Sequence, residues 1–105
     1  MAKEVKTVAR YLLLWKVDTS RMAESPQDRA AAFSMLLAMV REDMAKGAVK
    51  DWGSYVGEMR GYAVVEGTEV EIGGFIQRYV PYVSFKSHHA ASISQVEEVT
   101  KNMAG

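Results

Sequence analysis

The chain has 105 residues, which is enough for one compact domain and too few for two. Thirteen Lys and Arg residues balance thirteen Asp and Glu residues, so the chain lacks the basic surface that binding to nucleic-acid phosphates requires. It contains no Cys, which excludes disulfides, thiolate nucleophiles and cysteine-ligated metal centres.

The apolar residues near the N-terminus are too few for a secretory signal or a membrane span. Residues 1–10 include Lys3, Glu4 and Lys6, and the longest apolar run that follows extends only from Tyr11 to Trp15. We therefore expect a cytoplasmic protein with no membrane partner.

The first two predicted elements are a strand and a long helix. Residues 8–17 predict a central strand, because apolar side chains occupy both of its alternating sets. A helix is predicted at about 26–46, with Ser25 as N-cap, Pro26 in the first turn and Gly47 as the stop signal. Its predicted buried stripe is Ala30, Phe33, Leu37, Val40 and Met44, widened by Leu36.

The next segment predicts a hairpin and a second helix. Residues 48–67 contain a polar edge strand near 49–56, a turn at Gly57 and a central strand near 60–66. Thr68-Glu69-Val70-Glu71 is a capping-box pattern that opens a helix ending before Pro81. Each of Gly73 and Gly74 inside this helix costs about 1 kcal/mol relative to Ala. We interpret them as points of close packing against the sheet; the alternative is a mobile helix.

A fourth, more polar strand is predicted at 82–93, and Ser94 to Glu97 predicts the start of an amphipathic tail helix at about 95–103. The resulting βαββαβ order predicts a ferredoxin-like α+β fold. Its four-stranded antiparallel sheet would have the first and third strands in the middle and both helices on one face. We expect a single domain over residues 1–105, with its core at about 8–93.

One face of such a sheet is left without helices. The first strand is nonetheless apolar on both faces, so a bare second face would expose an apolar patch unusual in a monomer. We expect a second copy of the chain to cover it, giving a homodimer through the sheet face. The alternative is that the tail helix folds over the sheet.

Three features resemble dimeric α+β barrel proteins, most closely a group of short bacterial domains of unknown function. They are the Tyr11-x-Leu13-x-Trp15 strand, the long first helix and the hairpin from Trp52 to Arg60-Gly61, within a similarity covering residues 8–93. Relatives include muconolactone isomerase-like proteins and cofactor-independent monooxygenases. The resemblance implies a cleft for a small organic metabolite, with isomerase- or oxygenase-type chemistry and no cofactor. The Asn-Trp-His constellation typical of the monooxygenases is not evident, because the only Asn is Asn102, in the tail.

The two histidines, His88 and His89, are adjacent in the fourth strand. Consecutive strand residues point to opposite faces, which argues against a shared metal site, and we expect no metal. His89 shares the side of Val83 and Phe85, toward the helices. His88 shares the opposite side with Lys86, where a neutral imidazole can act as a base, so His88 is the candidate catalytic residue. The alternative is a solvated or structural role for both.

The candidate ligand cleft combines aromatic walls with a few polar groups. It consists of Lys16, Trp52, Tyr62, Lys86 and His88. One alternative is a non-catalytic dimerisation or interaction module, in which the aromatic residues only pack the sheet. A less favoured alternative is an RNA-binding domain, because Arg60 to Val65 resembles the start of the RNP1 signature. Val64 and Gly67 replace the remaining aromatic positions of that signature.

Overall fold

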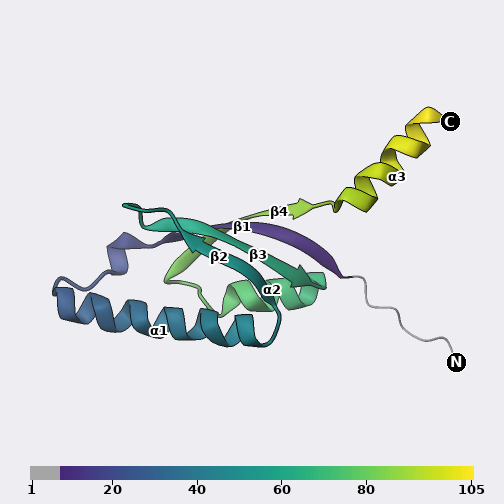
Figure 1. Ribbon diagram of the computed structural model, residues 1–105. Coiled ribbons are helices and arrows are strands. Elements are labelled where there is room, and N and C mark those ends of the chain that lie inside the picture. The colour runs from purple at the N-terminus through teal and green to yellow at the C-terminus, as the bar shows by residue number, and fades with distance from the viewer. Residues whose placement is uncertain (1–7) are drawn as a thin grey trace, which may run out of the picture.

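The computed structural model describes residues 8–105 (Figure 1), and the N-terminal residues 1–7, where no secretory signal is expected, lie outside the described part. The elements in chain order are β1 (Ala9–Val17), a short 3-10 helix (Thr19–Arg21), α1 (Pro26–Ala45), β2 (Val49–Ser54), β3 (Arg60–Gly67), α2 (Glu69–Gln77), β4 (Val83–Ala90) and α3 (Ile93–Ala104). The predicted βαββαβ order followed by a tail helix is confirmed. Within residues 8–105, no helix has the length and apolar character needed to cross a membrane.

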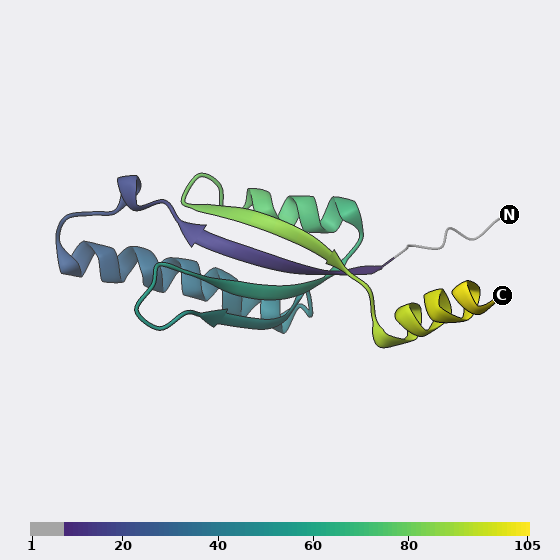
Figure 2. The same cartoon turned by 90° about the horizontal axis from the view of Figure 1, so that it is seen from above.

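The four strands form one antiparallel sheet in the order β2-β3-β1-β4. The strands predicted to be central, β1 and β3, are central. Helices α1 and α2 lie against the same face of the sheet, which we call the helix face (Figures 1 and 2). The other face, the open face, carries no helix. This arrangement is a ferredoxin-like α+β fold.

Local capping interactions explain where the helices begin. The Ser25 hydroxyl accepts a hydrogen bond from the Asp28 amide at 3.0 Å, and Pro26 occupies the first turn of α1. Thr68 and Glu71 form the predicted reciprocal capping box at the start of α2. In the tail helix the capping pair is Ser92 and Gln95, so α3 begins earlier than the predicted cap at Ser94.

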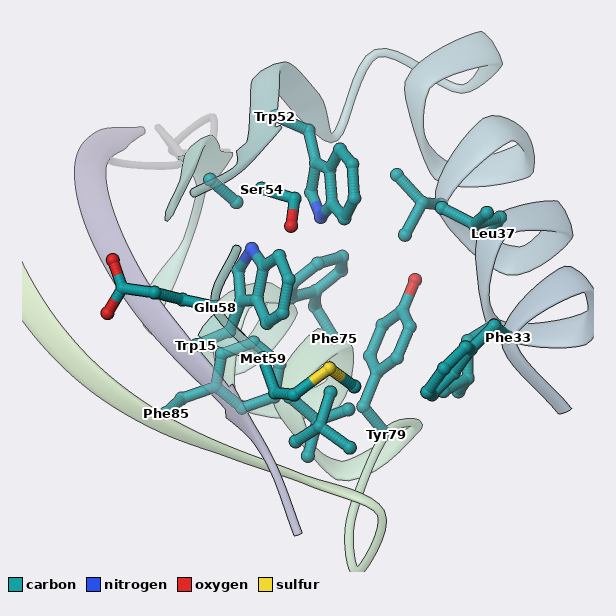
Figure 3. A pocket seen from close by; sticks show the side chains of 15 residues that line it. Trp15, Phe33, Leu37, Trp52, Ser54, Glu58, Met59, Phe75, Tyr79 and Phe85 are labelled. Carbon is teal, nitrogen blue, oxygen red and sulfur yellow. The ribbon is translucent and has the colours of Figure 1, made fainter. Parts of the chain in front are cut away.

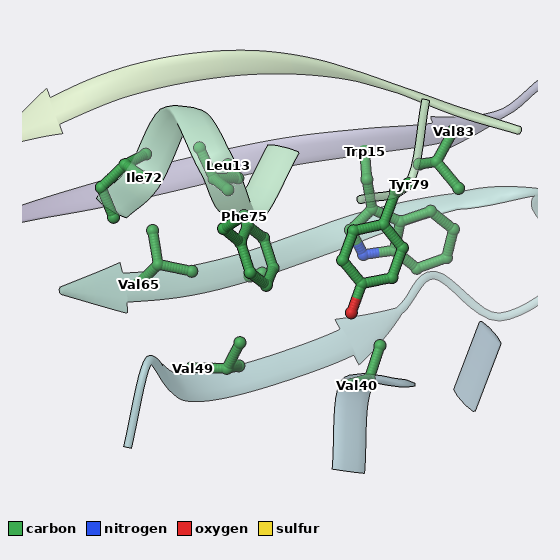
Figure 4. Close-up of a cluster of buried hydrophobic side chains, with 10 residues drawn as sticks. Leu13, Trp15, Val40, Val49, Val65, Ile72, Phe75, Tyr79 and Val83 are labelled. Carbon is green, nitrogen blue, oxygen red and sulfur yellow. The ribbon is translucent and has the colours of Figure 1, made fainter. Parts of the chain in front are cut away.

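The hydrophobic core lies between the helix face and the two helices (Figure 4). Its buried members are Leu13, Trp15, Val40, Val49, Ala63, Val65, Ile72, Phe75, Tyr79 and Val83. The alternation of β3 places Ala63 and Val65 in this core and leaves Tyr62 and Val64 on the open face.

The buried stripe of α1 differs from the predicted one by a rotation about the helix axis. Val40 is buried and Phe33 and Leu36 are half-buried, whereas Leu37 and Met44 are exposed. The same stripe continues to Asp43, which is buried although it is charged. Leu37, on the flank of α1, therefore borders the core and stays partly exposed.

Helix α3 stands away from the rest of the chain, beyond the end of the sheet (Figures 1 and 2). None of its residues is buried. The alternative in which the tail helix folds over its own sheet is therefore not the arrangement of this chain.

Candidate functional site

A cavity of about 420 Å³ lies between α1 and the helix face of the sheet (Figure 3). Its walls are almost entirely apolar and rich in aromatic rings. The side chains that define its shape are Trp15 of β1, Trp52 of β2, Phe33 and Leu37 of α1, Tyr79 after α2 and Phe85 of β4. A concave apolar space of this size is typical of sites for small organic molecules.

Two stacked indoles form one wall of the cavity. The rings of Trp15 and Trp52 lie nearly parallel, at an angle of 8° with centroids 5.3 Å apart. The Trp15 Nε1 group donates a hydrogen bond to the carbonyl oxygen of Tyr62 at 3.1 Å, which fixes that ring. Gly61 is paired with Trp15 across the strands, and a Cβ at Gly61 would overlap the indole. The glycine therefore allows the ring to lie across β3.

An irregularity in β2 places Trp52 in this wall. Val49 pairs with Val65, but Asp51 already pairs with Val64, so one extra residue is accommodated between them as a β-bulge. The bulge inverts the alternation beyond it. Trp52 consequently pairs with Ala63 and joins Val49 on the helix face, whereas a regular strand would have turned it to the open face.

Tyr79 closes the cavity beside a buried carboxylate. Its hydroxyl donates a hydrogen bond to Asp43 Oδ2 at 2.8 Å, and Arg78 donates to Asp43 Oδ1. Burial and then the hydrogen bond to Asp43 raise the pKa of Tyr79 far above its usual range. The phenol is therefore neutral at ordinary pH, and it offers the cavity an aromatic ring rather than a base.

The polar groups of the cavity lie where the turn between β2 and β3 approaches it. Ser54 and Glu58 are the polar side chains there; Ser54 lies beside Trp52, and the Glu58 carboxylate points away from the centre of the cavity (Figure 3). Glu58 is exposed and lies 3.7 Å from the Arg60 guanidinium. The cavity thus has an apolar interior and a small polar rim, which suits a molecule with a mainly apolar body and a polar end.

The structure divides the five predicted ligand residues between the two faces of the sheet. Tyr62 and Lys86 flank Leu14 on the open face, His88 is paired with Leu12, and Lys16 is paired with Ser84 of β4. Trp52 lies on the helix face because of the bulge. The expectation that Trp52 shares one cleft with the other four is therefore wrong. Sequence reasoning does not identify Tyr79 and Phe85 as cavity residues, because an aromatic side chain on a buried side looks the same in the sequence whether it lines a cavity or fills a core.

The open face holds one polar interaction that the sequence did not predict. The Tyr62 hydroxyl donates a hydrogen bond to Asp51 Oδ2 at 3.2 Å. The negative charge of Asp51 is the main reason that the pKa of Tyr62 is raised above its usual value. Asp51 reaches this face through the same bulge that sends Trp52 to the other one.

The two histidines lie on opposite faces, as their alternation predicts. His89 stacks on Tyr11 with ring centroids 4.9 Å apart, on the side of the helices. His88 is exposed on the open face. Among residues 8–105, no three His, Asp or Glu side chains are grouped closely enough to hold a metal ion.

No protein family, curated protein or solved structure matches this chain. The geometry itself defines the class of protein, a ferredoxin-like α+β domain with an aromatic cavity on its helix face and a bare open face.

Proposed function

We propose that this protein binds a small, mainly apolar organic metabolite in the cavity between α1 and the sheet. The observation that supports this proposal best is the cavity of about 420 Å³ with two stacked indoles as its wall. Flat aromatic walls favour a planar ligand, because ring stacking adds about 0.5–1.5 kcal/mol to the burial of apolar surface. The resemblance to dimeric α+β barrel proteins points to the same kind of ligand.

The chemistry of the lining favours binding over catalysis. Isomerase- or oxygenase-type reactions need an acid or base within hydrogen-bond reach of the substrate. Of the described residues that line the cavity, the titratable ones are Glu58, at the rim, and Tyr79, whose hydroxyl is already bonded to Asp43. His88, the candidate catalytic residue, lies on the other face of the sheet. We therefore propose a binding protein that needs no cofactor.

The two Trp residues of the chain both line the cavity, so intrinsic fluorescence reports on it directly. A library of planar organic metabolites would be screened for compounds that change Trp emission and raise the melting temperature. A compound at a hundred times its dissociation constant stabilises the folded state by about 2.7 kcal/mol.

Leu37→Asp tests the location of the site, because it places a charge on the cavity wall at an exposed position where folding tolerates it. Met35→Asp is the matched control, since Met35 lies on the same helix, is more exposed and does not line the cavity. We expect at least a tenfold loss of affinity in Leu37→Asp alone. Equal affinity in the two variants, or a library without any stabilising compound, would contradict the proposal.

A second function, self-association through the open face, is favoured by a separate observation. Leu12 and Leu14 of β1 and Tyr62 and Val64 of β3 form an apolar island on that face, and each is only half-buried in the single chain. Covering such a surface removes apolar area from water at roughly 25 cal/mol per Å². Sedimentation at micromolar concentration should show a homodimer, and a monomer would rule this function out.

A further inference from the structure

Helix α3 carries an apolar stripe that its own chain leaves uncovered. Ile93, Val96, Val99 and Met103 recur at helical spacing and share one side of the helix. These side chains are 76%, 49%, 56% and 82% exposed. An amphipathic helix whose apolar stripe stays largely exposed in its own chain implies a partner for the stripe.

The low stability of so short a helix on its own also indicates that α3 needs a packing partner. Helices of about twelve residues are marginal in water on their own, and most of their stability in proteins comes from packing of the apolar side. The capping box of Ser92 and Gln95 fixes where α3 begins but supplies no packing. The helix is therefore stabilised most when its stripe packs against a complementary apolar surface.

The open face of the sheet is such a surface. Its island of Leu12, Leu14, Tyr62 and Val64 lies on the central strands, with Leu12 opposite Val64 and Leu14 opposite Tyr62. Only residues 91–92 connect β4 to α3, and α3 points away from the sheet, on the side opposite α1 and α2 (Figure 1). The helix is thus presented to a molecule that approaches the open face.

We propose that the stripe of α3 packs on the open-face island of a second copy of this chain, and that the second copy returns the same contact. This inference rests on the proposed self-association and names the element that completes it. A reciprocal exchange of this kind is an isologous contact that closes by two-fold symmetry, so it produces a dimer and nothing larger.

Dimensions and charge both fit this arrangement. A helix of 12 residues is about 18 Å long, and a strand of 9 residues is about 30 Å long, so α3 fits within the length of the face. Glu97 borders the stripe on the helix. On the sheet, Lys16 and Lys86 border the island, and Asp51 and the Arg10–Glu66 ion pair lie on the same face, so this border is net positive. Opposite charges around an apolar centre are the usual composition of a protein interface.

Because the chain has no Cys, single cysteines can report the contact by cross-linking. A Val99→Cys chain mixed with a Val64→Cys chain should form a covalent heterodimer under mild oxidation. Glu98→Cys is the control, since Glu98 lies on the polar side of α3. We expect at least a tenfold lower yield of heterodimer from Glu98→Cys than from Val99→Cys.

The oligomeric state supplies the second measurement. Val96→Asp/Val99→Asp places two charges in the stripe, and Ser94→Asp/Asn102→Asp places the same two charges on the polar side. Sedimentation should show a monomer for the first variant and an unchanged dimer for the second. Neither change removes a buried contact, because α3 has no buried residue, so the rest of the fold should be unaffected.

The remaining outcomes separate the two proposals. A wild-type monomer would overturn both self-association and helix exchange. A dimer that survives Val96→Asp/Val99→Asp would overturn the exchange alone and leave another form of pairing. A Val64→Cys/Val99→Cys double variant that oxidises only within one chain would also overturn the exchange, because α3 would then cover its own sheet.

Discussion

Asp43 links the two helices of the helix face. It is only 3% exposed, and its carboxylate accepts hydrogen bonds from Arg78 and Tyr79 at the end of α2. A buried carboxylate is tolerated when hydrogen bonds and an opposite charge compensate its lost hydration. The interaction therefore holds α1 against the segment that closes the cavity.

Asp43→Asn should destabilise the protein by about 2–3 kcal/mol. The Asn side chain keeps the shape of Asp, but its NH₂ group would face one of the two donors, Arg78 or Tyr79. The negative charge that pairs with Arg78 is also lost. The cost stays below the ~3–5 kcal/mol of a fully buried pair because Arg78 remains in contact with solvent. Urea unfolding with an unchanged slope would measure the difference.

Glu42→Gln is the matched control for that substitution. Glu42 precedes Asp43, is exposed, and pairs with Lys46 at 3.0 Å and more distantly with Arg78 at 3.8 Å. Exposed ion pairs of this type contribute little to stability. Glu42→Gln should therefore lower the free energy of unfolding much less than Asp43→Asn does. Equal losses in the two variants would show that the buried network does not hold the helices together.

At the scale of elements, the sequence predicts the starts of α1 and α2 because their caps are local, whereas the cap of α3 is Ser92, two residues before the predicted one. Ser25 and Thr68 act on amides three residues away in their own segment, so their roles can be read without the fold. The bulge of β2 cannot be read in this way. Which residue is accommodated as an extra one depends on how β2 pairs with β3, and that pairing decides the face on which Trp52 lies.

Asp43 of α1 is a second feature whose role depends on residues far away in the sequence. It continues the spacing of Phe33, Leu36 and Val40, so a charge in a buried stripe was a signal that could have been used. Its partners lie about 35 residues away in the sequence, and only the fold brings them together. The rotation of α1 about its axis, which exposes Leu37, likewise depends on packing between distant elements.

Gly73 and Gly74 give a prediction at the element scale. A Cβ at either position would meet no atom within 4 Å, so the interpretation of close packing against the sheet is wrong. Replacing either glycine by Ala should therefore stabilise the protein by about 0.5–1 kcal/mol, because the unfolded chain loses freedom and the helix loses none. Chemical unfolding of the single variants measures the gain.

Gly61→Ala is the opposite case and serves as the comparison. Its Cβ would overlap both the Trp15 ring and the carbonyl oxygen of Gly53, so the substitution should destabilise β3 and disturb the indole wall. A loss of stability in Gly73→Ala or Gly74→Ala would mean that α2 needs its glycines for a reason other than packing.

At the scale of the whole molecule, β1 explains why the chain has two separate surfaces. Its residues Leu13 and Trp15 enter the core on the helix face, while Leu12 and Leu14 lie half-exposed on the other. The doubly apolar pattern predicts two faces that need cover. It does not predict that the cavity lies on one of them and the island on the other, because the bulge and the course of α3 decide that.

Because the sheet separates the cavity from the open face, the two proposed functions should be independent. Changes at sites that share no partner usually combine additively. Val96→Asp/Val99→Asp should lower the melting temperature by removing the partner copy, yet a cavity ligand should still raise it by the same amount as in the wild type. Leu37→Asp should lose that ligand effect and still sediment as a dimer. If the helix variant lost half or more of the ligand-induced shift when measured by calorimetry, the cavity would depend on the second copy and the two faces would act as one site.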